Sequence, residues 1–134
     1  MTKTIYLVRH GQIYRDGNCD TLNEEGLQFA SDLPRLLDFS KINFIASVKG
    51  KNRCHETIRN IKKVDVKFEE YDKIDFYYLK PYFDALKHSI SVICYGKEEI
   101  VEIFKIFNIE INEENSKSFY GKIIKILIDE NYKN

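Results

Sequence analysis

The sequence predicts an α/β fold, a three-layer αβα sandwich with a mostly parallel sheet. Short apolar segments rich in β-type residues alternate along the chain with segments whose apolar residues recur every three or four positions. Strands that alternate with helices in this way favour βαβ units and parallel pairing. With 134 residues and 43% apolar side chains, the chain is expected to form one domain, residues 1–134, around one core.

The beginning of the chain predicts a strand, a loop and a helix. Residues 4–8 are the expected first strand, and residues 12–22 are expected to form an irregular loop over its end. Asn23 has the right side chain to cap the helix that follows, because its oxygen can accept a hydrogen bond from a backbone N–H of the first turn. Pro34 is expected to kink this helix.

A second strand and helix are expected next. Residues 42–48 have the composition of a short buried strand, and residues 49–51 suit its exit turn. Asn52 is the expected cap of the following helix, and residues 64–68 resemble a further strand. The two lysines of the turn have two open interpretations, since they either face solvent or add positive charge to a pocket at the strand end.

The second half of the chain continues the alternation. Residues 71–78 are aromatic and ambiguous, residues 81–87 favour a helix, and residues 89–95 form a fully apolar strand. Gly96 is expected to turn this strand into an amphipathic helix. A last strand is expected within residues 121–128.

Polar residues follow the first strand directly, and they are Arg9, His10 and Gly11. Ligands of open α/β sheets bind at the carboxyl ends of the strands, so this cluster is placed to contact a substrate. Arg9 carries a planar, permanently charged group suited to phosphate, and a histidine can act as a nucleophile near neutral pH. A second arginine, Arg53, follows the next expected strand. These residues favour phosphoryl transfer through a phosphohistidine.

Three segments within the first 57 residues carry a common signature: Arg9-His10-Gly11, residues 21–30 (TLNEEGLQFA) and residues 53–57 (RCHET). In this order they resemble the histidine phosphatase superfamily, which includes the cofactor-dependent phosphoglycerate mutases and many small phosphatases. The resemblance implies a phosphoglycerate-mutase-like fold. It also implies that His10 attacks phosphorus while Arg9 and Arg53 bind the phosphoryl oxygens.

One departure from the family pattern concerns the phosphate pocket. Members carry a second histidine at the end of a later strand, usually followed by glycine, whereas this chain has Tyr95-Gly96. A neutral phenol donates one hydrogen bond but carries no positive charge at neutral pH. The loss of one such preorganised donor typically lowers the rate about a hundred- to thousandfold. The resemblance therefore implies a pocket of Arg9, Gln12, Arg53, Tyr95 and Gly96 with impaired catalysis.

A second departure concerns the proton donor. The segment that best matches the family's acidic segment is residues 73–77, which begins with a lysine in the place of the acid. Glu70 is the predicted acid, and Asp72 is an alternative. Without a proton donor, only activated leaving groups such as aryl or acyl phosphates would react readily.

Two functions stay open at this point. One is a phosphatase that acts on a small phosphorylated substrate through His10, and the other is a non-catalytic member that binds phosphate. A phosphatase is favoured over a mutase, because the segment from Asp72 to Ser89 is only about twenty residues. That length is too short for the helical insertion that covers the site of the mutases.

Composition limits the partners and cofactors. Lys plus Arg and Asp plus Glu are both 21, so no overall charge attracts nucleic acid or an anionic membrane. The partner that the resemblance implies is a small phosphorylated molecule or phosphate. The three cysteines have no metal-ligand spacing, and the mechanism that the resemblance implies requires no metal. The chain also has no dinucleotide-binding glycine pattern and no phosphate-loop lysine motif, so neither a metal nor a cofactor is expected. Without a signal peptide, a cytoplasmic protein is expected. The sequence does not indicate an oligomeric state.

Overall fold

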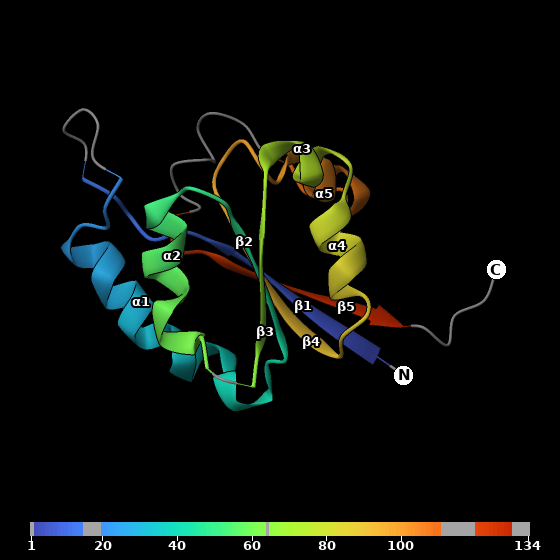
Figure 1. Cartoon of the computed structure of the whole chain (residues 1–134), viewed down its shortest axis with the longest axis horizontal. Helices are drawn as coiled ribbons and strands as arrows, with labels where there is room; N and C mark the ends of the chain where they lie inside the picture. The colour runs from blue at the N-terminus through green and yellow to red at the C-terminus, as the bar shows by residue number, and fades with distance from the viewer. Residues whose placement is uncertain (1, 15–19, 64, 111–119, 130–134) are drawn as a thin grey trace.

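The computed structural model describes residues 2–14, 20–63, 65–110 and 120–129. A five-stranded sheet with the order β3-β2-β4-β1-β5 forms the middle layer (Figure 1). Strands β1 to β4 pair in parallel, and β5 is antiparallel to β1. The strands are β1 (Thr2–Arg9), β2 (Phe44–Val48), β3 (Lys67–Tyr71), β4 (Ile90–Tyr95) and β5 (Ile123–Asp129).

Helices cover both faces of this sheet (Figure 1). Helices α1 and α2 pack against each other on one face, and α3, α4 and α5 lie on the other. The helices are α1 (Glu24–Leu37), α2 (Asn52–Ile58), α3 (Lys73–Tyr77), α4 (Lys80–Ala85) and α5 (Val101–Ile106), with short 3-10 turns at Phe39–Lys41 and Arg59–Ile61. The predicted αβα sandwich with a mostly parallel sheet is therefore confirmed.

Most elements begin and end near the predicted residues. Asn23 caps α1 as expected, because its side-chain oxygen accepts a hydrogen bond of 2.9 Å from the backbone N–H of Gly26. Helix α1 continues through Pro34 to its end. The strand predicted at residues 64–68 begins three residues later than predicted, because β3 begins at Lys67. The backbone N–H of Val66 donates to the carbonyl of Lys63 just before it. Helix α3 occupies the segment that was ambiguous in sequence.

Strand β1 brings its end against two other segments. The register of β1 and β4 pairs Arg9 with Tyr95, so the two predicted strand ends coincide. The backbone N–H of His10 donates to the carbonyl of Tyr95 at 3.1 Å, and the carbonyl of His10 accepts from Gly121 at 3.1 Å. The backbone of His10 is thus held from both sides at the carboxyl end of the parallel strands.

Candidate active site

His10 is buried just beyond the end of β1, with 1% of its surface exposed. Its Nδ1 lies 2.8 Å from the carbonyl oxygen of Gly11. A carbonyl only accepts, so Nδ1 carries the proton and Nε2 keeps its lone pair. The pKa of His10 is lowered to about 4, chiefly by burial and further by the positive charges of Arg9, Arg53 and Lys51, while the Gly11 hydrogen bond opposes this shift. At neutral pH His10 is a neutral imidazole, the form that a nucleophile requires.

This depressed pKa predicts a specific dependence of stability on pH. The unfolded chain binds a proton at His10 near pH 6.5, whereas the folded chain binds it near pH 4. The contribution of His10 is therefore fully present above pH 6.5 and is lost as the pH falls towards 4, by at most about 3 kcal/mol. Urea unfolding between pH 7 and 4 is expected to show a smaller loss for His10→Gln than for the unchanged chain. If NMR showed that the His10 ring of the folded chain titrates with a midpoint near pH 6.5, the prediction would be wrong.

Arg9 is buried beside the histidine, with 4% of its surface exposed. Its guanidinium carbon lies 4.5 Å from the centre of the Tyr120 ring, and the ring of His10 lies 5.5 Å from the same ring. Tyr120 thus covers both predicted residues. Sequence reasoning missed it, since only the pairing of β5 with β1 brings this part of the chain to His10.

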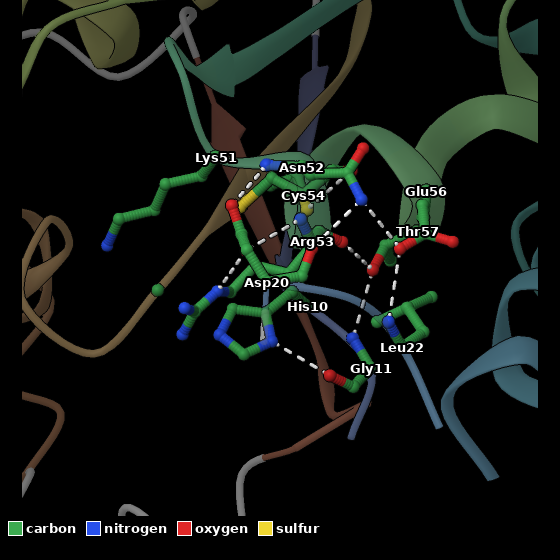
Figure 2. A network of polar contacts seen from close by, with 12 residues as sticks. His10, Gly11, Asp20, Leu22, Lys51, Asn52, Arg53, Cys54, Glu56 and Thr57 are labelled. Carbon is green, nitrogen blue, oxygen red and sulfur yellow. Dashed lines mark hydrogen bonds and ion pairs between the residues drawn. The ribbon is translucent and has the colours of Figure 1, made fainter. Parts of the chain in front are cut away.

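Arg53 lies in the first turn of α2 and is held by Asp20. Its Nε donates to Asp20 Oδ1 at 2.6 Å, and the backbone N–H groups of Asn52 and Arg53 donate to the same carboxylate at 2.7 and 3.1 Å (Figure 2). Although burial raises the pKa of Asp20, these hydrogen bonds hold it below its usual value. The prediction that Asn52 caps α2 is wrong, because Asn52 is the first helical residue and a distant carboxylate accepts from the helix start.

A second set of contacts joins the three segments of the sequence signature. The N–H of Gly11 donates to Thr57 Oγ1 at 3.0 Å, and the Thr57 hydroxyl donates to the carbonyl of Arg53 at 2.7 Å (Figure 2). A Cβ on Gly11 would lie only 2.8 Å from the Cα of Gly26. The loop after β1, the start of α1 and helix α2 are therefore in direct contact around His10.

Tyr95 and Gly96 lie at the end of β4, as predicted. The ring of Tyr95 is buried and packs edge-on against Phe104, with 5.6 Å between the ring centres. Its hydroxyl has no hydrogen-bond partner within the described residues, and burial raises the pKa of this phenol above its usual value of 10. The backbone N–H of Gly96 donates to Glu99 Oε1 at 2.9 Å.

The structure places two other predicted residues in separate contacts. Glu70, in β3, has its carboxylate 3.0 Å from Nε2 of His55. Gln12 accepts a hydrogen bond of 2.9 Å from the Asn23 side chain and lines a cavity of about 410 Å³ beside the start of α1. Among the residues that the structure describes, no hydrogen bond or ion pair links either side chain to His10. The alternative acid, Asp72, caps α3.

A lysine paired with a buried carboxylate completes the surroundings of His10. Lys51 Nζ lies 2.8 Å from Glu99 Oε2, and the two side chains are 31% and 2% exposed. The two lysines of the turn after β2 were expected either to face solvent or to add positive charge to a pocket. Lys51 is paired with Glu99 and does not simply face solvent. The sequence could not single out Glu99, because the preceding residue, Glu98, is also a glutamate. In the structure Glu98 is exposed and paired with Lys73.

Two other kinds of site are not found in the described part of the chain. No group of three or more His, Cys, Asp or Glu side chains there is arranged to hold a metal ion. No helix there has the length and apolar character needed to cross a bilayer.

Comparison with known proteins supports the fold. No family model matches the sequence, and no curated protein sequence matches it either. Among solved structures, a protein assigned as the phosphohistidine phosphatase SixA from Agrobacterium tumefaciens aligns over 87% of this chain and 81% of its own, with a TM-score of 0.56 and 18% identity. A phosphoserine phosphatase from Entamoeba histolytica, in complex with 3-phosphoglyceric acid, aligns over 81% of each chain, with a TM-score of 0.54 and 13% identity. The chain therefore shares its fold, a phosphoglycerate-mutase-like fold, with these two proteins.

Proposed function

We propose that this chain is a phosphatase that transfers a phosphoryl group from a small phosphorylated molecule to His10 and then hydrolyses the phosphohistidine. The observation that carries this proposal is the state of His10, a buried neutral imidazole whose Nδ1 is held by a carbonyl. The positive charges of Arg9 and Arg53 act on its ring. The likeness in fold to two proteins named as phosphatases supports the same function.

The proposed reaction has two steps. In the first, the Nε2 lone pair of His10 forms a bond to phosphorus while the bond from phosphorus to the leaving group breaks, and the leaving group takes the electron pair. Arg9 and Arg53 offset the charge on the phosphoryl oxygens during this transfer. In the second step a water oxygen bonds to phosphorus, the P–N bond breaks and the electron pair returns to Nε2. The attacking water gives up a proton and the departing oxyanion takes one up, so the products are the alcohol or acid and inorganic phosphate.

The leaving group is the basis for proposing a substrate class. Glu70 stays the predicted proton donor, and its described ion pair is with His55. A leaving group that departs as a stable anion needs little protonation, so we propose aryl or acyl phosphates as the preferred substrates. The cavity beside Gln12 offers room for a small leaving group next to the loop that carries His10.

The alternative function is phosphate binding without turnover. The observation that favours it is Tyr95, a neutral phenol at the position where the family carries a second histidine. In this alternative His10, Arg9 and Arg53 would form an anion site that recognises a phosphorylated small molecule.

Phosphate release and phosphate binding together separate the two functions. We expect para-nitrophenyl phosphate and acetyl phosphate to be hydrolysed faster than a sugar phosphate, and inorganic phosphate to bind in a calorimeter. Binding without release from any of the three would favour the non-catalytic alternative. The absence of both release and binding would overturn both functions.

Replacing Tyr95 by histidine is expected to raise turnover. The new imidazole would supply a donor that can carry positive charge, and one such donor is worth about a hundredfold in rate. Tyr95→Phe is the matched control, since it removes only the hydroxyl. Because that hydroxyl is buried without a described partner, Tyr95→Phe is expected to unfold at the same or a higher urea concentration. Unchanged turnover in Tyr95→His would mean that the proton donor or the pocket shape limits the rate.

A further inference from the structure

The ion pair of Lys51 and Glu99 joins two strand ends of the sheet. Lys51 lies between β2 and α2, and Glu99 lies between β4 and α5. The Glu99 carboxylate uses one oxygen for the N–H of Gly96 and the other for the Lys51 ammonium. Since Glu99 is almost fully buried, both contacts fix the position of Lys51 at the carboxyl end of the sheet.

The space over Gly96 shows how close this pair is to the nucleophile. A Cβ built on Gly96 would lie 2.7 Å from Glu99 Oε1, 3.2 Å from Lys51 Nζ and 3.6 Å from His10 Cδ2. The carbon Cδ2 is bonded to Nε2, the nitrogen that keeps its lone pair because Nδ1 contacts the Gly11 carbonyl. The ammonium of Lys51 and the Cδ2 edge of the imidazole therefore border the same small space over Gly96, and the positive charge of Lys51 also lowers the pKa of His10.

The Lys51 ammonium has donors left for a ligand. An ammonium carries three N–H donors, and one of them bonds to Glu99. About a third of the side chain remains accessible. By contrast Tyr95, which stands in the place of the second histidine, is buried and adds no positive charge. With tyrosine in place of the second histidine, the pocket would have one positively charged side chain fewer than the family pattern. Lys51 provides a positive charge in its place.

We propose that Lys51 is a direct ligand of the phosphoryl group and that Glu99 is the residue that positions it. This inference rests on the proposed phosphate site at His10. Lys51 binds a phosphoryl oxygen through an N–H not used by Glu99, and it supplies the positive charge that Tyr95 cannot. The ligand chemistry is a tetrahedral or trigonal phosphorus oxyanion, so inorganic phosphate and orthovanadate are suitable probes.

The test compares two lysines of the same turn. Lys51→Met is expected to weaken the binding of phosphate and orthovanadate by roughly ten- to hundredfold, the usual effect of losing one hydrogen bond to a charged group. Lys51→Arg keeps the charge and is expected to restore most of the affinity. Lys49→Met is the matched control, because Lys49 is exposed two residues away and is expected to leave the affinity unchanged.

A measurement on the unchanged protein makes the test independent of how well the variants fold. Orthovanadate is expected to protect Lys51, but not Lys49, from acetylation followed by mass spectrometry. If the unchanged chain binds phosphate while Lys51→Met binds it equally well, or if orthovanadate fails to protect Lys51, the inference is wrong and the proposed function stands. If the unchanged chain binds neither probe, the proposed phosphate site itself is wrong.

Discussion

Turnover is expected to fall by at least about a thousandfold when His10 is replaced by alanine. In the proposed mechanism the imidazole forms the bond to phosphorus, and no other described side chain presents a buried, neutral nitrogen at the end of β1. The measurement is the steady-state release of para-nitrophenol. His88→Ala is the control, since His88 precedes β4, at the other end of the parallel strands, where its ring stacks on Phe44, and turnover is expected to stay within about twofold of the unchanged chain.

The covalent intermediate gives a second measurement of the same prediction. The unchanged chain, mixed with radiolabelled acetyl phosphate and stopped in alkali, is expected to carry label at His10 because a phosphohistidine survives alkali. His10→Ala is expected to carry none. Retained turnover in His10→Ala, or label at another residue, would contradict the phosphohistidine mechanism.

The second large effect concerns stability and involves Gly26, where α1 meets the loop after β1. A Cβ on Gly26 would lie 2.2 Å from the carbonyl oxygen of Gln12 and 3.0 Å from Leu22 Cβ. The first contact is with backbone, which cannot rotate away, so Gly26→Ala must displace the loop that carries His10. We expect a loss of about 3 kcal/mol in the free energy of unfolding, measured in urea.

Whether Gly26→Ala lowers or raises the free energy of unfolding shows which is larger, the cost of the close contact or the gain in helix propensity. Alanine in place of glycine within a helix normally stabilises the folded chain by about 1 kcal/mol. The contact with Gln12 is expected to outweigh that gain. Glu25→Ala, at the exposed neighbouring position, is expected to change stability by less than about 0.5 kcal/mol. An increase in stability for Gly26→Ala would show that the start of α1 moves easily, against the packing described above.

The layers of the fold were predictable because hydrophobic patterns are local. The apolar strands and the amphipathic helices are visible in windows of a few residues. The cap of α1, Asn23, lies only three residues before Gly26, whose N–H donates to its side chain. The residues at the ends of β1 and β4 were predictable for the same reason. Their meeting follows from the parallel register, which pairs Arg9 with Tyr95.

The parts of the site that could not be predicted depend on contacts between distant segments. The backbone N–H groups at the start of α2 donate to Asp20, not to the side chain of Asn52. Asp20 lies 32 positions before Asn52 in the sequence. Glu99 differs from Glu98 only in the direction of its side chain, which no local pattern reveals. Tyr120 reaches His10 through the pairing of the last strand with the first.

The position of β1 in the sheet has a consequence for synthesis of the protein. Strand β1 is made before the other four strands, but its two neighbours are β4 and β5, the last two of the five to be made. Contacts between segments so far apart in sequence form slowly, because a long loop must close before any of them is gained. A nascent chain that ends before Tyr120 would lack both the hydrogen bond from Gly121 to His10 and the ring of Tyr120. The proposed nucleophile is therefore translated before the segments that complete its surroundings, and it reaches its working environment only after Tyr120 and Gly121 have been made.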